Sequence, residues 1–554
     1  MDKIWLKDYP PGMPAEINPD QYPSLKALAE DAMARYAGRN AYVLMGKSIT
    51  YADLERLSAR FGAWLQQQGF VKGDRIAIML PNLLQYPIAM FGALRAGLVV
   101  VNTNPLYTAD ELRHQLIDSG ATSIVILENF CHVLQKVVGD TQVKKVVVTG
   151  VGDLLGFPKG ALVNGVIRYL RRQVPAWRLP GAVRIRDILD ATAAPPLQAV
   201  AVTGEDLAFL QYTGGTTGIS KGAMLSHRNL VANVLQCRAW HEQVSIENAT
   251  YIIALPLYHI FSLTANCLLY MSVGGYGVLI PNPRDFPAFV KELIRHPPNT
   301  LNGVNTLFNA LMNAPGFEKI DFSHLVATVG GGMAVQAAVA ERWLKLTGCS
   351  LTQGWGLTET SPVAAVEKLH KLEFSGAIGL PLPSTEISIR SEDGSDLGIE
   401  ASGEICVRGP QVMRGYWRRD DETAKVMLPD GWLRTGDIGR MDAHGYVFLE
   451  DRKKDMISVS GFKVYPNEVE AVAARCPGVF EAAAIAEPDE HSGEIVALYV
   501  VKKDPSVTAE AITAFMRQSL TSYKVPRKIY FRTELPKTNV GKILRRALRD
   551  GGSV

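Results

Sequence analysis

Hydrophobic positions in the first part of the chain follow two alternating spacings. Between Leu54 and Leu65 apolar residues recur every three to four positions, which predicts a helix with one buried face. The nearly continuous apolar run Arg75–Leu80 predicts a short buried strand, and Thr108–Glu111 forms a capping-box pattern that opens another helix. Alternating strands and helices indicate parallel sheets covered by helices on both faces.

A long uncharged stretch, Asn248–Pro283, contains no Asp, Glu, Lys or Arg. Within it, Ile260–Ile280 is hydrophobic enough to resemble a membrane span. Pro256 and the pair Gly274–Gly275 interrupt it, so we predict a strand, a buried helix and a second strand instead. Its lack of charge has two explanations, which stay open: an ordinary core, or an uncharged wall around an apolar ligand.

The segment Gly156–Arg186 is basic and contains no acidic residue. Its cations alternate with apolar and aromatic residues, a pattern that suits an anionic bilayer surface but also a solvated helix on the protein surface. The basic residues are Lys159, Arg168, Arg171, Arg172, Arg178, Arg184 and Arg186.

Composition narrows the possible classes of protein. With 554 residues, 47% hydrophobic and 20% charged, the chain is long enough for several packed units and does not resemble a disordered protein. A net charge of +3 argues against a dedicated nucleic-acid binder. The six cysteines lie far apart without metal-ligand spacing, and the first residues lack the apolar run of a secretory signal. We therefore expect a cytoplasmic protein.

A charge cluster, Asp451–Asp455, marks a predicted domain boundary. It follows the strand-like Gly445–Leu449 and precedes about a hundred residues with their own strand and helix patterns, enough for a small α+β domain. We predict an N-terminal domain over residues 1–451 and a C-terminal domain over residues 452–554.

The sharpest local signal is the loop Tyr212–Gly222, which follows a strand-like run. Its glycines allow close approach of backbone N–H groups to anionic oxygens, its threonines and serine add hydroxyls, and Lys221 adds a cation. This chemistry suits phosphate. The loop lacks the Walker A spacing, so an ordinary P-loop ATPase that releases ADP is disfavoured. A plain Gly/Thr-rich turn is the alternative.

Five motifs in order resemble the signatures of the adenylate-forming superfamily, which includes acyl-CoA synthetases, luciferases and peptide-synthetase adenylation domains. They are Tyr212–Gly222, Gly354–Glu359, Trp432–Asp437, Asp451–Asp455 and Pro536–Lys542. Further segments along the whole chain are similar to bacterial long-chain fatty acyl-CoA synthetases, namely Ile17–Asp20, Leu80–Tyr86, Val101–Tyr107 and Leu255–Phe261.

This resemblance implies a fold, an activity and a set of small-molecule substrates. The fold would be α/β, with a large N-terminal domain of sheet-and-helix subdomains plus a small β element, followed by a small mobile α+β domain. The activity would be that of a long-chain fatty acid–CoA ligase. ATP activates the fatty acid to an acyl-adenylate with the help of Mg²⁺, and CoA then forms the thioester that feeds fatty-acid degradation.

The resemblance also assigns roles to individual residues. Catalysis falls to Lys542, Glu359 and His259, Mg²⁺ binding to Glu359 and Thr213, and the hinge to Lys454. His259 could equally be an ordinary core histidine. Trp355 stands where the family usually has Tyr. The nucleotide-binding residues are Tyr212, Thr213, Gly214, Gly215, Thr216, Thr217, Gly218, Lys221, Gly331, Gly332, Gly354, Trp355, Gly356, Thr358, Asp437 and Arg452.

Under this reading the uncharged stretch would line an acyl tunnel, together with residues 305–311 and 326–332, and the basic segment would contact the cytoplasmic face of the inner membrane. No nucleic-acid partner is expected, and a homodimer stays open. Alternatives are a fatty acyl-AMP ligase that loads a carrier protein, a medium-chain acyl-CoA ligase, and a non-catalytic lipid-binding scaffold. Chain-length preference and the role of Lys463 are also open.

Overall fold

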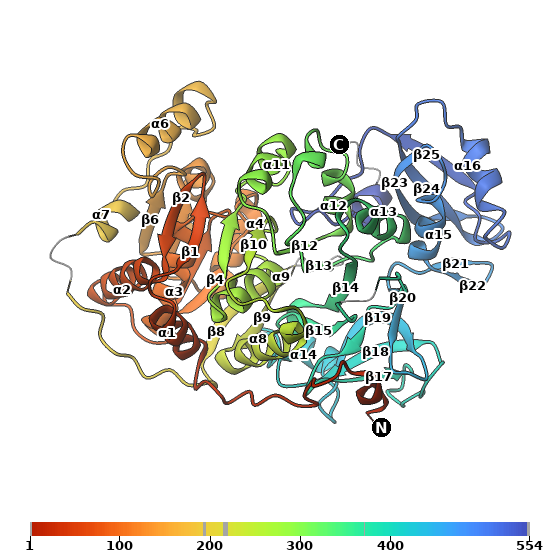
Figure 1. The fold of residues 1–554 in the computed structure, drawn as a ribbon, viewed down its shortest axis with the longest axis horizontal. Coiled ribbons are helices and arrows are strands. Elements are labelled where there is room, and N and C mark those ends of the chain that lie inside the picture. The colour runs from red at the N-terminus through yellow and green to blue at the C-terminus, as the bar shows by residue number, and fades with distance from the viewer. Residues whose placement is uncertain (1–2, 192–194, 214–219, 370–371, 551–554) are drawn as a thin grey trace.

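The computed structural model describes residues 3–191, 195–213, 220–369 and 372–550, and this part of the chain contains four β-sheets with flanking helices (Figure 1). The predicted helix cap and the predicted buried helix face are both present. Thr108 and Glu111 form a complete capping box at the start of the helix Ala109–Ser119, and the apolar face between Leu54 and Leu65 is buried.

A seven-stranded sheet forms one half of the large N-terminal region. Its strands run parallel except for the last pair, β8 and β9, which is antiparallel. In spatial order they are β7 (Val183–Arg184), β6 (Lys145–Thr149), β5 (Ser123–Leu127), β3 (Arg75–Met79), β4 (Val99–Asn102), β8 (Leu207–Thr213) and β9 (Lys221–Ser226).

A nine-stranded sheet forms the other half. It is parallel in its middle and antiparallel at both ends. Its strands are, in order, β16 (Leu380–Pro381), β15 (Val363–Val366), β14 (Leu351–Gly356), β13 (Ala327–Gly330), β12 (Thr300–Gly303), β10 (Thr250–Ile253), β11 (Tyr276–Leu279), β1 (Asn40–Leu44) and β2 (Lys47–Thr50).

Two smaller sheets complete the described fold. The antiparallel four-stranded sheet contains β17 (Glu386–Arg390), β18 (Gly403–Arg408), β19 (Leu433–Met441) and β20 (Val447–Arg452). The C-terminal sheet contains β21 (Ile457–Val459), β22 (Phe462–Val464), β23 (Val479–Asp489), β24 (Gly493–Lys502) and β25 (Lys528–Arg532). The predicted boundary after residue 451 therefore falls at the end of β20, just before the C-terminal sheet begins.

Helices surround these sheets and separate them (Figure 1). The α-helices are α1 (Leu25–Arg35), α2 (Tyr51–Gln67), α3 (Gln85–Arg95), α4 (Ala109–Ser119), α5 (Cys131–Gln135), α6 (Lys159–Gly165), α7 (Ile185–Leu189), α8 (His227–His241), α9 (Ile260–Ser262), α10 (Leu269–Ser272), α11 (Phe286–Arg295), α12 (Asn305–Leu311), α13 (Ala337–Thr347), α14 (Asp420–Val426), α15 (Pro466–Ala473), α16 (Ala509–Met516) and α17 (Arg545–Arg549). Two π-helical segments are η4 (Val166–Leu170) and η6 (Leu263–Leu268). Short 3-10 turns are η1 (Ile4–Asp8), η2 (Glu128–Phe130), η3 (Val138–Asp140), η5 (Glu242–Val244), η7 (Phe317–Lys319) and η8 (Thr358–Thr360).

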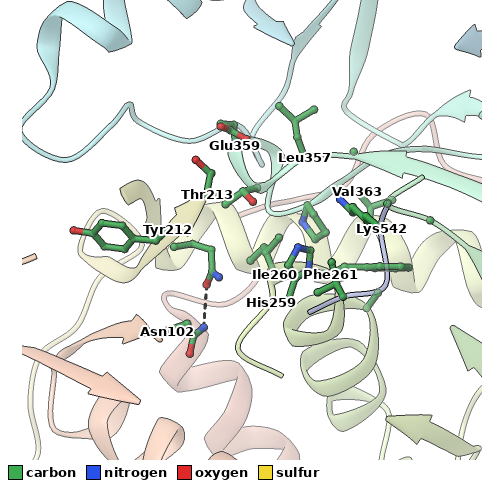
Figure 2. A pocket seen from close by; sticks show the side chains of 18 of the residues that line it. Asn102, Tyr212, Thr213, His259, Ile260, Phe261, Leu357, Glu359, Val363 and Lys542 are labelled. Atoms are coloured by element: carbon green, nitrogen blue, oxygen red, sulfur yellow. Dashed lines mark hydrogen bonds between the residues drawn. The ribbon is translucent and has the colours of Figure 1, made fainter. Parts of the chain in front are cut away.

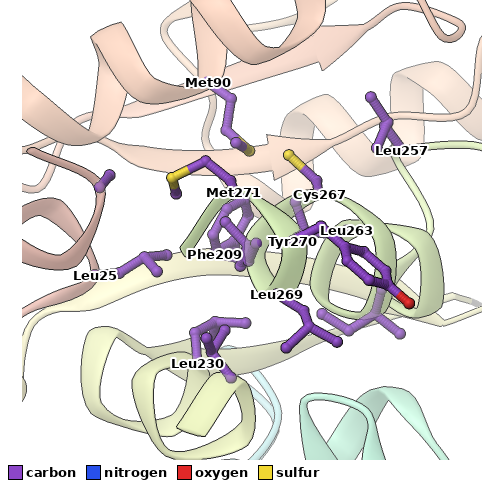
Figure 3. Packing of buried hydrophobic residues seen from close by; sticks show 14 of the residues in the cluster. Leu25, Met90, Phe209, Leu230, Leu257, Leu263, Cys267, Leu269, Tyr270 and Met271 are labelled. Atoms are coloured by element: carbon purple, nitrogen blue, oxygen red, sulfur yellow. The ribbon is translucent and has the colours of Figure 1, made fainter. Parts of the chain in front are cut away.

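The main hydrophobic core joins both large sheets and the helices α3, α8 and α10. Figure 3 shows Met90, Phe209, Leu230 and Leu269 packing there from four different elements. The uncharged stretch supplies part of this core as a strand, a buried helical segment over residues 260–272 and a second strand, as predicted. Among the described residues, no helix is long and apolar enough to cross a membrane.

Candidate functional site

A cavity of about 810 Å³ brings together most of the predicted site residues (Figure 2). The ends of several strands from both large sheets meet around it, which is a common place for ligands in α/β folds. The predicted residues that line it are Tyr212, Thr213, Lys221, His259, Gly331, Gly332, Gly354, Trp355, Gly356, Thr358, Glu359, Arg452, Lys454 and Lys542.

The predicted phosphate loop connects β8 to β9, which pair so that Thr213 lies opposite Lys221. The Ser220 hydroxyl donates a hydrogen bond to the Thr213 carbonyl oxygen over 2.6 Å, which holds the two ends of the loop together. Both ends line the cavity. The predicted residues Gly214, Gly215, Thr216, Thr217 and Gly218 lie outside the described residues.

Glu359 belongs to a polar network on the cavity wall that the motifs do not reveal. The Tyr416 hydroxyl donates to Glu359 Oε1 over 2.7 Å. The Lys221 ammonium lies 5.2 Å from the centre of the Tyr416 ring and is paired with the Glu422 carboxylate. A phosphate group that reaches Lys221 must therefore compete with Glu422. Tyr416 and Glu422 lie between the recognised motifs, and no spacing rule marks them.

Asp437 is held by two partners from different strands. It is only 4% exposed, its Oδ1 lies 3.1 Å from the Arg452 Nε, and its Oδ2 accepts a hydrogen bond from the Trp355 indole over 2.9 Å. Pairing of β19 with β20 sets Asp437 opposite Arg452. Trp355, predicted only as a stacking surface, thus also orients the carboxylate. Asp437 lines a second cavity, which shares Arg452 and Trp355 with the first.

The predicted adenine-side glycines allow close packing that side chains would prevent. A Cβ on Gly331 would lie 2.9 Å from Phe261 Cζ, and one on Gly356 would lie 1.8 Å from the Pro362 carbonyl oxygen. Gly332 has a φ of +76°, and a Cβ there would lie 2.9 Å from Lys542 Cε. Gly356 therefore requires glycine sterically, and the positive φ of Gly332 favours glycine there, whether or not a base binds beside them.

Lys542 reaches the cavity from a turn that is docked on the N-terminal region. The Thr306 hydroxyl on α12 donates to the Gly541 carbonyl oxygen over 2.8 Å, and the Lys542 N–H donates to the Thr538 hydroxyl over 3.1 Å. Burial, with a smaller contribution from the charge of Arg452, lowers the pKa of Lys542 to about 8. None of the hydrogen bonds or ion pairs among the described residues engages its Nζ, so the ammonium is available to a ligand.

His259 lies beside Lys542 in the same cavity (Figure 2). Burial and the charge of Lys542 lower its pKa to about 3, so its ring is neutral near pH 7. Its Nδ1 accepts the Phe261 backbone N–H over 3.3 Å. In a neutral imidazole the other nitrogen then carries the hydrogen, so Nε2 is a donor.

A second cavity of about 1060 Å³ lies between the N-terminal region and the C-terminal domain. Lys454 lines both cavities, and partial burial together with Arg452 lowers its pKa to about 8. Of the tunnel segments predicted from the sequence, 305–311 contributes Asn305, Thr306 and Asn309 to this second cavity instead of the first.

Apolar side chains line part of the first cavity, and we call this part its apolar end. Ala265 and Leu269 from the uncharged stretch line it, as predicted, and so does Val329. The sequence did not point to two further contributors, β15 with Val366 and the C-terminal end of α8. A helix with an almost fully buried surface carries no periodic signal that marks its cavity-facing residues.

Comparisons with known proteins agree on one family. The profile of the AMP-binding enzyme family matches residues 29–417, and that of the AMP-binding enzyme C-terminal domain matches residues 468–542. A long-chain-fatty-acid–CoA ligase from Salmonella typhimurium is 54% identical, over 99% of this chain and 98% of that protein.

Solved structures show the same architecture. An anthranilate CoA ligase in complex with anthranoyl-AMP has a TM-score of 0.85 at 23% identity and covers 97% of this chain and 99% of its own. An o-succinylbenzoate CoA synthetase from Bacillus subtilis, in complex with its acyl-adenylate intermediate, has a TM-score of 0.77 at 26% identity and covers 94% and 98%. The predicted fold class is therefore confirmed.

Proposed function

The chain belongs to the family of AMP-binding enzymes, and we propose that it is a long-chain fatty acid–CoA ligase, an acid–thiol ligase. The fatty-acid carboxylate attacks the α-phosphate of ATP, which gives an acyl-adenylate and pyrophosphate. The CoA thiolate then attacks the acyl carbonyl carbon, forms the thioester and releases AMP. The full-length similarity to long-chain-fatty-acid–CoA ligases supports this substrate class.

One observation carries the proposal: a single cavity has both polar and apolar lining. We call the part lined by Thr213, Glu359 and Lys542 its polar end, and Leu269 and Val366 belong to its apolar end. A fatty acid needs both, because its carboxylate must meet the nucleotide while its chain is removed from water. Each buried methylene is worth roughly 0.8 kcal/mol, so a deep apolar end favours long chains.

The nucleotide would occupy the polar end. Its phosphates would lie against the loop that begins at Thr213 and ends at Lys221, and its ribose hydroxyls would bind the Asp437 carboxylate and the Arg452 guanidinium. The adenine would lie along the strand segment Gly354–Gly356 and the glycines Gly331–Gly332, with Trp355 offering an aromatic face. Thr358 would line the same site.

The residues at the polar end fit a magnesium ion. Glu359 and Thr213 offer a carboxylate and a hydroxyl oxygen to the same cavity (Figure 2), and Mg²⁺ beside nucleotides takes one or two carboxylates plus phosphate oxygens. When bound, Mg²⁺ neutralises charge on the phosphates. The Tyr416 hydroxyl orients the Glu359 carboxylate through its hydrogen bond to Oε1.

Lys542 would promote adenylation. During attack on the α-phosphate, negative charge develops on oxygens that lie in a partly water-excluded site, where a fixed cation stabilises it strongly. An ammonium without a protein partner serves this purpose without first breaking an ion pair. The His259 Nε2–H could donate to the substrate carboxylate and keep it in line, whereas a pKa of about 3 makes His259 a poor general base.

Thioester formation would require the C-terminal domain to move. The pantetheine thiol must reach the acyl carbonyl close to where Lys542 lies, so residues 452–554 would rotate against residues 1–451 about Lys454. The second cavity, which lies between these two parts, offers space that such a rotation would reshape.

The experiment that tests the ligase reaction is a product assay with Mg-ATP and fatty acids of graded length, each with and without CoA. We expect AMP and acyl-CoA to rise together and to be highest with long chains, as a supplier of acyl-CoA for β-oxidation requires. Accumulation of acyl-adenylate that CoA does not consume would favour a carrier-protein ligase. A maximum at medium chains would favour the medium-chain alternative, and absence of turnover would contradict the proposal.

We also propose peripheral contact with the cytoplasmic face of the inner membrane, through the protruding segment α6–η4 (Figure 1). Its apolar side chains are unusually exposed: Leu162 is 68% exposed, and Tyr169 and Leu170 are each 77% exposed. Phe157, just before α6, is 93% exposed. Apolar and aromatic tips beside cations are typical of interfacial segments. The homodimer that the sequence left open stays a prediction, which sedimentation velocity tests.

Five of the seven cations of the basic segment fall into two groups. Arg168 and Arg184 both pair with the nearly buried Glu128, so they hold the segment to the body of the protein. The second group is exposed and would bind anionic lipid headgroups; it consists of Arg171, Arg172 and Arg178. A variant with Tyr169→Ser and Leu170→Ser should lose flotation with anionic vesicles, while Leu346→Ser, an exposed leucine on α13, should not. Equal flotation of both would refute the contact.

A further inference from the structure

The first cavity contains a buried histidine that the ligase reaction does not explain. The last residue of α8, His241, lines its apolar end together with Cys237 one turn earlier. Ala265, Leu269 and Val366 line the same cavity. Asn302 also lines it, but its amide already donates to the Ala265 carbonyl oxygen over 3.0 Å and to Asn266 Oδ1 over 2.9 Å. His241 is 6% exposed.

The hydrogen bonds of His241 define which nitrogen carries its proton. Nδ1 lies 2.8 Å from the Cys237 carbonyl oxygen, and because a carbonyl only accepts, Nδ1 must be the donor. Burial lowers the pKa of His241, so the ring is neutral near pH 7. Nε2 is then a bare acceptor. It is buried and has no hydrogen-bond partner among the described residues.

The ring cannot easily turn away to find another partner. Its hydrogen bond to Cys237 spans one helical turn, and its edge packs against Tyr270 with ring centres 6.2 Å apart. A buried acceptor without a donor loses the hydrogen bonds it had with water. The methyl end of an ordinary fatty acid cannot restore them.

We propose that the apolar end of the cavity is a subsite for a hydroxyl group carried at or near the far end of the acyl chain, with His241 Nε2 accepting its hydrogen bond. This inference rests on the proposed function, because it assumes that an acyl chain enters the cavity. A hydroxyl is the group that fits: it donates, it is neutral, and it is small. An ionised carboxylate cannot donate, and an ammonium would have to be desolvated among hydrocarbon side chains.

The test compares three series of acids at matched chain lengths on the wild-type protein: plain, ω-hydroxy and ω-methoxy. An ω-methoxy group keeps the oxygen but cannot donate. Without an acceptor, both oxygen-bearing series should be poorer substrates than plain acids at every length. We expect instead that at one length kcat/KM for the ω-hydroxy acid exceeds that for its ω-methoxy counterpart by about tenfold, the effect of one buried hydrogen bond.

Variants locate the effect on His241. His241→Phe should abolish the hydroxyl preference, and His241→Gln, which keeps an acceptor, should retain part of it. His227→Phe is the matched control, since His227 is a buried histidine at the other end of α8 and does not line the cavity. If plain acids are turned over but ω-hydroxy acids show no advantage over ω-methoxy acids at any length, the inference is wrong. If plain acids are not turned over, the proposed function itself fails.

Discussion

Lys542 should give adenylation a pH dependence that differs between the free enzyme and its complex with ATP. Burial lowers the Lys542 pKa from 10.5 to about 8, which corresponds to ~3 kcal/mol in favour of the neutral amine. The charged form stabilises the developing negative charge, and it predominates below the pKa. We therefore expect kcat/KM for adenylation to fall as pH rises through about 8.

Bound ATP should change this profile, because phosphate charge beside Lys542 favours the ammonium and raises its pKa. The fall in kcat, which reports the bound enzyme, should then occur at higher pH than the fall in kcat/KM. The assay is exchange of pyrophosphate into ATP without CoA, since the CoA thiol itself titrates in this range.

Two variants identify the titrating group. Lys542→Arg keeps a charge throughout the range, so its profile should lose the fall near pH 8 whatever its absolute rate. Lys454→Arg is the control, because the pKa of Lys454 is also lowered to about 8. The reasoning is refuted if the fall persists in Lys542→Arg, or if it disappears in Lys454→Arg alone.

Other predictions concern the ribose side and the glycines. Asp437→Asn keeps an acceptor for the Trp355 indole but removes the negative charge. The KM for ATP should therefore rise about tenfold, with little change in Tm. Initial rates measure the KM, and thermal melts measure the Tm. Gly332→Ala should slow adenylation by displacing Lys542, whose Cε would meet the new Cβ at 2.9 Å. Gly348 is the control, because it has a similar φ of +74° but no neighbour within 4 Å of an added Cβ. Gly348→Ala should therefore cost ~1–2 kcal/mol of stability and leave the adenylation rate unchanged. A normal adenylation rate in Gly332→Ala would contradict the expected displacement of Lys542.

Local signals made much of the fold predictable from the sequence. The capping box of Thr108 and Glu111 involves residues three positions apart, and the buried strand at Arg75–Met79 follows from its own apolar run. Such features depend on neighbours along the chain, which the sequence displays directly. The division of the uncharged stretch into a strand, a buried helical segment and a second strand is predictable because Pro256 and Gly274–Gly275 interrupt it.

Contacts between distant segments were not predictable in this way. Tyr416 reaches Glu359 across 57 residues, and Thr306 holds the Lys542 turn from 235 residues away. No periodicity or motif spacing encodes such pairings, because they depend on how whole elements dock. The unpaired Nε2 of His241 could not be predicted either, because it depends on η6 and β15, which are distant in sequence and line the same cavity.

We propose that Lys542 acts in adenylation and must leave the site for thioester formation. The most direct measurement supplies purified acyl-adenylate and CoA to the wild-type protein and to Lys542→Ala, and follows acyl-CoA and AMP. We expect Lys542→Ala to lose most of its adenylation activity yet to convert the supplied acyl-adenylate at a rate close to that of the wild type. Equal loss of both half-reactions, or adenylation that survives the substitution, would contradict the proposal.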